Sequence, residues 1–577
     1  MERNIECTLR DGVVLRADVF RPDDDDPHPA LLQRTPYDKT FISSFSIDPF
    51  RMAEAGYTVV VQDVRGRFAS DGVFEPYRHE GEDGYDTVQW VAEQPWCDGQ
   101  VGMCGISYLA QVQLQAAALR PPALRAIAPM ESPSGSTGGD RVRAGALALG
   151  VLSYWGVSMA PAEILRRGRK QPELRKEFPA AIDDIDNLDQ HVRRLPLVPF
   201  PPIDERAGGI SPQFDQTVRG EFNQPMPRFR HSDVEVPAFV IAGWYDLFLQ
   251  PDLEHFTALR ESARTEEARR LTRLLVAPWS HGRADHTVGE LDFGFRSGPL
   301  MIDLREDLND LQRRWFDARL RGVNRGLDDE PRVRLFVMGI NRWRDEEEWP
   351  LRRAREQQWH LHRDYRGEAP LQGHLMPASG GLDLTPPQEA EPSVFWLEPD
   401  DPVPTRGGAI LMSPWYIKGP VDQLRTECRD DVLLFTSEPL RQPLEVTGRV
   451  KLVCWVAAET VDTDVVARLC DLHPDGRSFN LMDGVLRLGY RNGTPQAERL
   501  NPGEVVRVEV DLWSTAHVFL PGHRLRLQVC ASDFPRYDRN PGTGETSAIA
   551  TRVLPQRNRL FHDPERPSHL LLPVVPA

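Results

Sequence analysis

The first 350 residues alternate short apolar runs with longer stretches that are helical in composition. Such runs are typical of strands buried on both faces of a parallel sheet. The apolar runs lie at 30–32, 57–62, 101–106, 126–128, 238–242, 274–277 and 333–338. The helical stretches lie at 84–93, 108–119 and 304–320. This alternation predicts a doubly wound α/β sheet. It is preceded by a hairpin, because Asp11-Gly12 is a strong turn signal between two strand-like segments.

The alternation is interrupted between about residues 131 and 235. A Gly/Ser-rich segment, 132–139, is followed by 144–162, which carries no charge for 19 residues, and then by charged, helical-looking sequence. The charge-free stretch contains several Gly and Ser residues, so a buried helix is favoured over a membrane span. An insertion at the carboxyl end of a strand lies over the ligand crevice of such a sheet, which predicts a helical cap.

The pattern changes again after about residue 351, where apolar and polar residues alternate. Val506, Val508 and Val510 point to one side of a predicted strand, with Arg507 and Glu509 on the other. Turn sequences such as 474–476, 501–503 and 521–522 separate these strands. Alternation of this kind predicts an antiparallel β-sandwich or jelly roll.

Composition excludes several classes of protein. The 577 residues include 69 Lys and Arg against 86 Asp and Glu, a net charge of −17, which argues against nucleic acid as the main partner. Seven cysteines form no C-x-x-C pair, so a reducing compartment fits best, and we expect a cytoplasmic protein. The N-terminus lacks the apolar core of a signal peptide. Nothing in the sequence fixes the oligomeric state.

The segment 101–110 carries the first candidate for chemistry. An apolar run ends in Gly105-Ile-Ser107, and a helical stretch starts at Tyr108, which is the layout of a nucleophile elbow. The full G-x-S-x-G pattern fails because Leu109 replaces the second glycine. Taken alone, Ser107 is more often a serine in an ordinary turn, but the strand-then-helix context favours a nucleophile.

Two further polar residues directly follow predicted strands. Asp246 comes after the run 238–242 and His281 after the run 274–277. The carboxyl ends of parallel strands meet at one edge of the sheet, and the chain order Ser, Asp, His is the order that α/β-hydrolases use. Asp246 alone could be a helix cap and His281 a loop histidine, but three strand-end residues in this order predict a catalytic triad.

Several longer motifs extend this pattern along nearly the whole chain. They are Arg34-Thr-Pro-Tyr37-Asp-Lys39, Gln62-Asp-Val-Arg65-Gly-Arg67, Ser70-Asp-Gly72, Gly105-Ile-Ser107-Tyr108-Leu109, Gly243-Trp-Tyr-Asp246, Pro278-Trp-Ser-His281, Arg314-Trp-Phe-Asp317, Trp343-Arg-Asp345, Trp349-Pro350 and the segment 401–408. With these motifs the chain resembles the cocaine esterase / X-Pro dipeptidyl-peptidase family of α/β-hydrolases (the CocE/NonD hydrolases). Ala110 stands where the family commonly has glycine, and it is small enough for the elbow to survive.

The resemblance implies a role for each candidate residue. Ser107 is the nucleophile, His281 the general base and Asp246 the carboxylate that orients the imidazole. Tyr37 and the backbone N–H of Tyr108 form the oxyanion hole. The resemblance also implies that the C-terminal domain helps to close the active-site cleft.

Other side chains in or near these motifs are predicted to have structural or substrate-binding roles. Asp63, Arg65 and Arg67 follow a predicted strand, and we expect them to form a structural ion-pair network. Four aromatic residues are candidates for substrate binding, with core or cap packing as the alternative for each. They are Trp155, Trp244, Phe248 and Trp279.

We therefore expect a serine hydrolase that cleaves ester or amide bonds of small molecules through an acyl-enzyme. The alternatives are an X-Pro dipeptidyl-peptidase, an α-amino acid ester hydrolase or acylase, and a non-catalytic binding protein. Nucleotide-binding and zinc-protease motifs are absent, so we expect no cofactor and no metal. The expected parts are an α/β-hydrolase core (1–131 and 236–350), a helical cap (132–235) and a C-terminal jelly roll (351–577).

Overall fold

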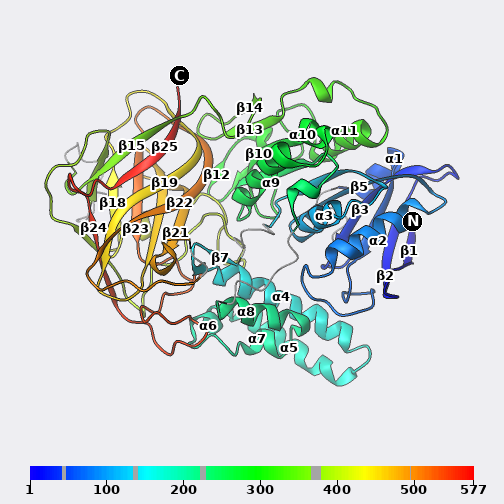
Figure 1. Ribbon diagram of the computed structural model, residues 1–577, viewed down its shortest axis with the longest axis horizontal. Coiled ribbons are helices and arrows are strands. Elements are labelled where there is room, and N and C mark those ends of the chain that lie inside the picture. The colour runs from blue at the N-terminus through cyan, green and yellow to red at the C-terminus, as the bar shows by residue number, and fades with distance from the viewer. Residues whose placement is uncertain (42–46, 134–140, 221–228, 366–378, 494–495, 577) are drawn as a thin grey trace.

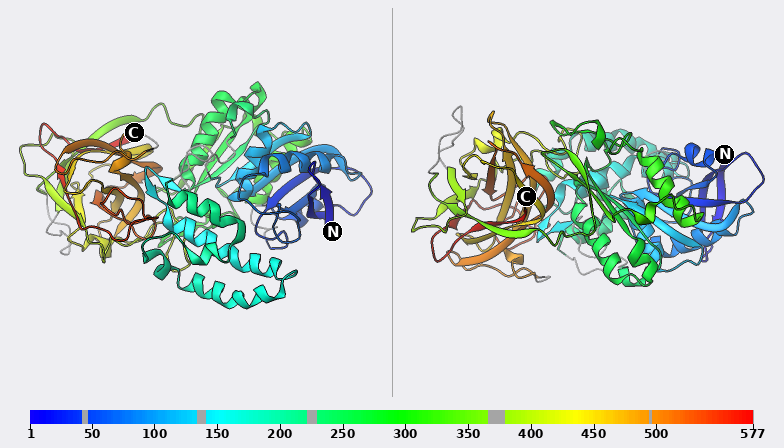
Figure 2. Two further views of the ribbon diagram at one scale, coloured as in Figure 1. Left: turned by 60° about the horizontal axis from the view of Figure 1, so that its bottom comes forward. Right: turned by 90° about the horizontal axis from the view of Figure 1, so that it is seen from above.

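The computed structural model describes residues 1–41, 47–133, 141–220, 229–365, 379–493 and 496–576. An α/β part, a group of helices and a β part lie side by side, with the N-terminus and the C-terminus in different parts (Figures 1 and 2). Most of the Gly/Ser-rich segment and residues 221–228 of the predicted cap lie outside the described residues. In the described part of the chain, no helix is long and apolar enough to cross a membrane.

The α/β part is built on a ten-stranded sheet, counted over the described residues, in the order β1-β2-β4-β3-β5-β6-β9-β10-β13-β14. The strands are β1 (Glu2–Thr8), β2 (Val14–Phe20), β3 (His28–Thr35), β4 (Thr58–Asp63), β5 (Cys97–Ile106), β6 (Leu124–Met130), β9 (Phe239–Tyr245), β10 (Arg273–Ser280), β13 (Val333–Val337) and β14 (Arg342–Glu346). The strands from β4 to β13 in this order pair in parallel, and β1, β2 and β14 pair antiparallel at the two edges. All seven predicted apolar runs are strands of this sheet.

Successive residues of the central strands enter two different cores. Leu32 and Val240 pack under one set of helices, whereas their neighbours Leu31 and Ile241 pack under the other. The first set is α2 (Glu80–Ala92), α3 (Tyr108–Ala118), α9 (Leu249–Ser262) and α10 (Glu266–Leu271), and the second is α1 (Pro49–Glu54) and α11 (Leu308–Leu320). A strand buried on both faces must be apolar throughout, which is why these runs show no alternation.

The predicted helices differ from the observed ones mainly at their ends. α2 begins four residues before the predicted residue 84, and α3 ends one residue before 119. α11 begins at Leu308 rather than 304, because the Asp307 side chain accepts a hydrogen bond from the backbone N–H of Asp310 and caps the helix.

The insertion between β6 and β9 is helical, as its composition predicts. Its elements are β7 (Val142–Arg143), β8 (Ala146–Leu147), α4 (Leu149–Arg167), α5 (Phe178–Asp186), α6 (Leu188–Arg193), α7 (Pro201–Asp204) and α8 (Ser211–Val218), with short 3₁₀ turns between them. The charge-free stretch 144–162 is only partly one helix, because its first residues lie in the β7–β8 hairpin. The insertion contacts the β part, where the Leu197 N–H donates to the Ser547 carbonyl.

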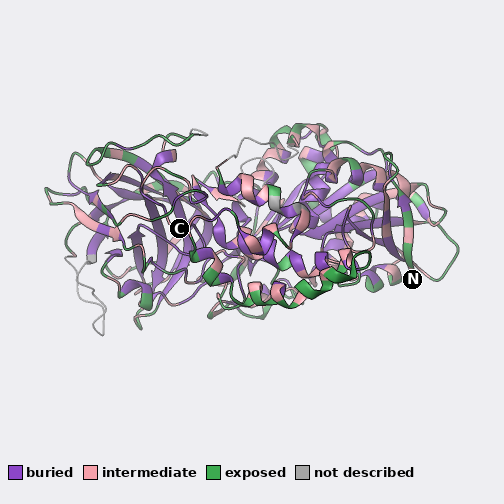
Figure 3. Cartoon of the chain, turned by 90° about the horizontal axis from the view of Figure 1, so that it is seen from below, coloured by how far each residue is buried: buried purple, intermediate pink, exposed green. Residues whose placement is uncertain are grey.

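The C-terminal part is a β domain whose strands are largely buried (Figure 3) and enclose one large apolar interior, with a smaller apolar cluster beside it. Its strands are β15 (Arg355–His362), β16 (Ser379–Asp383), β17 (Ser393–Leu397), β18 (Leu433–Thr436), β19 (Leu444–Ala458), β20 (Asp464–Leu472), β21 (Ser478–Arg487), β22 (Val505–Phe519), β23 (Arg524–Cys530), β24 (Gln556–Phe561) and β25 (His569–Val575), with the short helix α12 (Leu424–Glu427). The predicted alternation is present in β22, where Val508, Val510 and Leu512 are buried in this interior. Among the described residues, these strands pair antiparallel, as predicted, except that β16 pairs with β18 in parallel.

A buried histidine pair lies beside the insertion, where the 3₁₀ turn η3 (His231–Asp233) meets α9. His231 Nε2 and His255 Nδ1 are 2.8 Å apart, and no carboxylate is among the groups that act on either ring. Burial lowers the pKa of His231 to about 4, and burial with the neighbouring His231 lowers the pKa of His255 to about 3.

This pair predicts that stability falls as the pH drops from about 6.5 toward 4. The unfolded chain takes up protons on both histidines near pH 6.5, whereas the folded chain stays neutral at these sites until about pH 4. We expect the double variant His231→Asn/His255→Asn to lose less Tm than the parent between pH 7 and pH 4.5 in thermal scans. Phe256→Leu, on the same helix, should lower Tm at every pH with the parental pH dependence. Equal pH dependence in the double variant and the parent would contradict the assignment.

Candidate active site

The turn between β5 and α3 holds Ser107 in an unusual backbone conformation, φ 60° and ψ −122°. The turn is tight because Gly105, at φ 142°, leaves room for the next turn of chain: a Cβ at Gly105 would lie 2.5 Å from Leu109 Cβ. The Leu109 side chain therefore fills the space that a side chain at residue 105 would need. The turn forms although Leu109 replaces the second glycine of the G-x-S-x-G pattern. Such a strained strand-to-helix turn exposes the serine hydroxyl above the sheet edge.

Ser107, His281 and Asp246 lie in one hydrogen-bonded line. His281 Nε2 is 3.0 Å from Ser107 Oγ, and His281 Nδ1 is 2.7 Å from Asp246 Oδ2. Asp246 is fully buried, and its Oδ1 accepts the backbone N–H of Phe248 at 2.6 Å. The parallel sheet explains the meeting, since Ser107, Asp246 and His281 follow directly on β5, β9 and β10.

The Tyr37 hydroxyl faces the same serine. It accepts the indole N–H of Trp155 at 3.0 Å, and the Ser107 side chain is among the groups that lower the pKa of Tyr37. Burial raises the pKa of Tyr37 to about 12, so the phenol keeps its proton near neutral pH and can donate it. The backbone N–H of Tyr108 belongs to the first turn of α3, where an N–H has no carbonyl within the helix to bond.

The Tyr108 side chain fixes the start of α3. Its hydroxyl donates to Glu80 Oε1 at 2.7 Å and accepts the backbone N–H of Tyr77 at 3.0 Å. Glu80 Oε2 is in turn 2.7 Å from the Arg34 guanidinium, and all of these side chains are buried. Arg34 thus helps to fix the first turn of α3, because it pairs with the Glu80 carboxylate that accepts the Tyr108 hydroxyl.

The predicted ion-pair network surrounds the loop that carries Tyr37. Asp63 pairs with Lys39 at 3.2 Å, and Arg65 pairs with Asp83 at 2.6 Å. The Arg67 guanidinium donates to the Pro36 carbonyl at 2.9 Å and lies 3.7 Å from Glu163 of α4. These contacts join the Tyr37 loop to the helical insertion.

Two of the four aromatic candidates contact the site. Trp155 binds Tyr37, and the Phe248 ring lies edge-on to the His281 ring with 5.1 Å between centroids.

The prediction that Trp244 and Trp279 line the substrate pocket was wrong. Trp244 is buried in one core of the sheet and donates its indole N–H to the Phe336 carbonyl. Trp279 is buried in the other core and donates to the Ser297 carbonyl. Successive side chains along a strand point to opposite faces of the sheet. Trp244 and Trp279 each point to one of these faces, not to the edge where Ser107 lies.

Sequence reasoning missed three charged groups beside the triad. Glu131, which follows β6, places Oε2 3.6 Å from His281 Nδ1 and accepts the Gly282 N–H at 2.8 Å. Asp252 of α9 accepts the Ser132 N–H at 2.9 Å. Lys418 of the β domain donates to the His281 carbonyl at 3.0 Å. Glu131 could have been found, because it follows its strand in the same way as Asp246 and His281.

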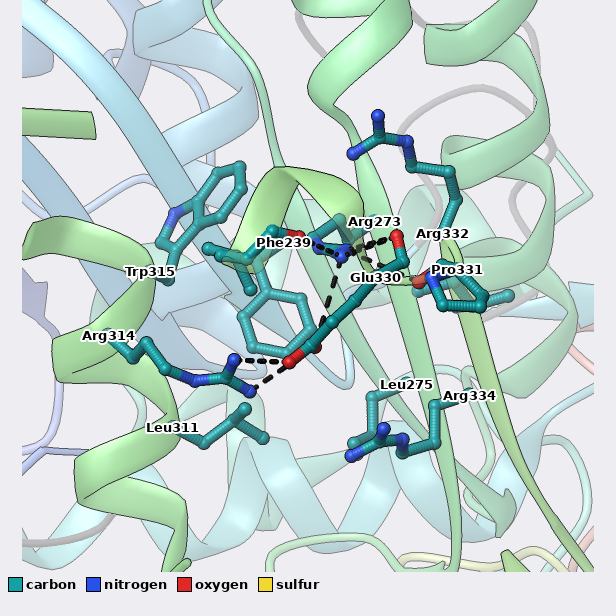
Figure 4. Close-up of a pocket in the computed structure, with 12 residues that line it drawn as sticks. Phe239, Arg273, Leu275, Leu311, Arg314, Trp315, Glu330, Pro331, Arg332 and Arg334 are labelled. Atoms are coloured by element: carbon teal, nitrogen blue, oxygen red, sulfur yellow. Dashed lines mark hydrogen bonds and ion pairs between the residues drawn. The ribbon is translucent and has the colours of Figure 1, made fainter. Parts of the chain in front are cut away.

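A separate arginine-lined pocket lies at the other end of the strands (Figure 4). Arg273 is the first residue of β10, whereas His281 follows the last, so the pocket and the triad are at opposite edges of the sheet. Glu330 lies among its guanidinium groups and pairs with Arg314 at 2.6 Å. The pocket has no part in the chemistry at Ser107.

The chain matches two protein families over most of its length. Residues 11–283 match the X-Pro dipeptidyl-peptidase (S15) family, and residues 325–571 match the X-Pro dipeptidyl-peptidase C-terminal non-catalytic domain. The chain is 36% identical to a cocaine esterase of Rhodococcus sp. (strain MB1 Bresler) over 590 aligned positions, which cover 99% of this chain and 98% of the esterase.

Solved structures share the fold from end to end. An aminopeptidase from a marine sediment Thaumarchaeota archaeon superimposes with a TM-score of 0.75 at 23% identity. An α-amino acid ester hydrolase superimposes with a TM-score of 0.73 at 22% identity. Both matches cover 100% of this chain and 96% of the other.

The packing of Leu109 against Gly105 predicts a steep cost for any side chain at residue 105. We expect Gly105→Ala to lower the free energy of unfolding by about 2–4 kcal/mol, from backbone strain and overpacking together, and to reduce ester hydrolysis. Gly99→Ala is the matched control, because Gly99 also has positive φ on β5 but nothing within 4 Å of its Cβ position. Gly99→Ala should cost about 1 kcal/mol and leave the rate unchanged. Equal losses in urea unfolding would contradict this account.

Proposed function

The chain belongs to the cocaine esterase / X-Pro dipeptidyl-peptidase family, and we propose that it is a serine hydrolase that cleaves carboxylic esters with Ser107, His281 and Asp246 as its triad. The observation that carries the proposal is the unbroken line of hydrogen bonds from Ser107 Oγ through the imidazole to Asp246. A serine hydroxyl is a weak nucleophile until a neighbouring base removes its proton, and this line supplies the base and its partner.

In the acylation step, Ser107 Oγ attacks the ester carbonyl carbon while its proton passes to His281 Nε2. The carbonyl oxygen becomes an oxyanion and accepts hydrogen bonds from the Tyr37 hydroxyl and the Tyr108 N–H. The bond between carbonyl carbon and alkoxy oxygen then breaks, and the imidazolium gives its proton to the departing alcohol. Asp246 stays ionised and accepts the Nδ1–H throughout.

In the deacylation step, water repeats the attack on the acyl-enzyme. Its proton passes to His281 Nε2 as its oxygen bonds to the carbonyl carbon. The bond to Ser107 Oγ then breaks, the imidazolium returns a proton to the serine, and the carboxylic acid leaves. The same oxyanion donors serve both steps, and no cofactor takes part.

Ester cleavage is favoured over removal of X-Pro dipeptides by the charges around the triad. A dipeptidyl-peptidase needs an acidic anchor for the free amine of its substrate. Among the described residues that face the triad, the acidic ones are Glu131, Asp246 and Asp252, and all three are buried and hydrogen-bonded to the protein. An ester or amide of a small molecule without a free amine fits this site better. A non-catalytic binding protein has no need of the aligned triad.

We further propose the division into a core (1–131 and 236–350), a cap (132–235) and a C-terminal jelly roll (351–577). Trp155 and Phe248 are proposed to contact substrate, because both touch groups of the site. A cytoplasmic location is supported by seven free cysteines, of which Cys428 alone is exposed.

The reaction class is tested by comparing p-nitrophenyl acyl esters with a Xaa-Pro-p-nitroanilide. We expect kcat/KM to favour the esters, and Ser107→Ala to reduce kcat on the order of 10⁶-fold. Labelling of Ser107 by a phosphonate, read by mass spectrometry, should be lost in the same variant. A preference for the anilide would overturn ester specificity, and wild-type rates in Ser107→Ala would overturn the mechanism itself.

The role of Tyr37 is tested separately by Tyr37→Phe. Removing one oxyanion donor should lower kcat by about 10²–10³-fold with little change in KM, because the ground-state carbonyl depends less on that hydrogen bond. Tyr154→Phe, which removes a phenol next to Trp155 on α4, should keep kcat within about twofold of the parent by the same reasoning. A kcat for Tyr37→Phe within threefold of the parent would contradict the assignment.

A further inference from the structure

Glu131 lies against the imidazole on the side away from Ser107. It follows β6 with φ 49°, is fully buried, and its backbone N–H donates to the Ile241 carbonyl at 2.8 Å. His281 Nδ1 therefore faces two carboxyl groups, Asp246 Oδ2 at 2.7 Å and Glu131 Oε2 at 3.6 Å. A single N–H cannot donate fully to both, and the shorter distance assigns it to Asp246.

The second carboxyl group has its own hydrogen bond. Glu131 Oε2 accepts the backbone N–H of Gly282 at 2.8 Å, and Gly282 directly follows His281. The side chain thus ties the loop that carries the imidazole to the end of β6. Its other oxygen, Oε1, is buried and has no hydrogen-bond partner among the described residues while both carboxyl groups are ionised.

The surrounding charges cannot neutralise three buried carboxylates. Asp246 and Glu131, at the ends of β9 and β6, lie near Asp252 of α9. Among the described residues, the groups that can carry positive charge against them are the His281 imidazole and the Lys418 ammonium, and the pKa of Lys418 is lowered in part by Arg283. Burial, and then the charge of Asp246, raise the pKa of Glu131 well above its usual range, and the same two causes act on Asp252. Of the three carboxyl groups, Asp246 has two N–H partners, the Phe248 backbone N–H and His281 Nδ1. We therefore assign the negative charge of the cluster to Asp246.

We propose, resting on the triad assigned above, that Glu131 is a positioning residue that works as a neutral carboxylic acid. Its Oε1–H donates to the Asp246 carboxylate while its Oε2 holds the Gly282 N–H. Carboxylate oxygens of Glu131 and Asp246 lie within 4.8 Å of each other, and Asp246 is among the groups that raise the pKa of Glu131. Asp246 then accepts from His281, Phe248 and Glu131, and its position is fixed from three sides.

The proposal predicts a pattern among three variants of one residue. Glu131→Ala removes both hydrogen bonds and should lower kcat by about 10–100-fold with little change in KM, since a small misplacement of a reacting group is costly. Glu131→Gln has an N–H₂ for Asp246 and a carbonyl for Gly282, so it should restore most of this loss. The acid limb of the kcat/KM profile should coincide for parent and Gln variant, because neither carries a charge at residue 131.

An ionised Glu131 would give the opposite result. If it acted as a second carboxylate that stabilises the imidazolium, Glu131→Gln would lower kcat as much as Glu131→Ala and move the acid limb of kcat/KM to lower pH. Either observation would overturn the proposal. Ile127→Ala, on β6 before Glu131 and buried in the core, controls for lost stability: it should lower Tm but keep kcat and the pH profile.

A parallel measurement distinguishes a failure of the Glu131 proposal from a failure of the proposed triad. Ser107→Ala is measured in parallel, and activity in that variant would overturn the proposed mechanism whatever residue 131 does. If Ser107→Ala is inactive while Glu131→Ala retains the parental kcat, the triad stands and the role of Glu131 is refuted.

Discussion

The site depends on holding one imidazole by hydrogen bonds at both of its ring nitrogens. Ser107 lies 3.0 Å from Nε2 and Asp246 lies 2.7 Å from Nδ1, and neither contact tolerates much rotation of the ring. The surrounding structure maintains these two contacts. The parallel register brings three strand ends to one edge, the elbow lifts Ser107 above it, and the Phe248 N–H fixes the carboxylate. The strained backbone at Ser107 persists because the strand before it and the helix after it are both deeply buried.

The other two parts of the chain complete this arrangement. The insertion supplies Trp155, whose indole N–H donates to the Tyr37 hydroxyl oxygen. The hydroxyl hydrogen of Tyr37 can therefore donate to a substrate oxygen in the site. The β domain supplies Lys418, which holds the His281 carbonyl, and its Pro420 carbonyl accepts the Glu290 N–H beyond that loop. The α/β part therefore carries the triad, but the geometry of the histidine loop is shared with the β domain. Separating the two would leave the loop without these partners.

The sequence predicted the sheet, and that Ser107, Asp246 and His281 lie together at its edge, for a simple physical reason. Strands buried on both faces must be apolar throughout, and polar residues that end such runs are brought together by the parallel register. The same reasoning failed for Trp244 and Trp279, because it located their strands but not the face to which each indole points. It also missed Lys418, which reaches the site from a different domain. Contacts of that kind depend on how domains pack, and no local pattern encodes them.

The number of negative charges around an imidazole decides how well it can serve as a base. One carboxylate orients the ring and stabilises the imidazolium that forms when Ser107 loses its proton. A second full charge at 3.6 Å would add to this stabilisation, so the imidazole would depend on both carboxylates rather than on Asp246 alone. By the proposal above, the buried cluster of Asp246, Glu131 and Asp252 carries one such charge, because carboxyl groups crowded together in a buried site with few cations keep their protons. The fold thus obtains the packing and hydrogen bonds of three carboxyl groups while exposing the imidazole to the charge of one.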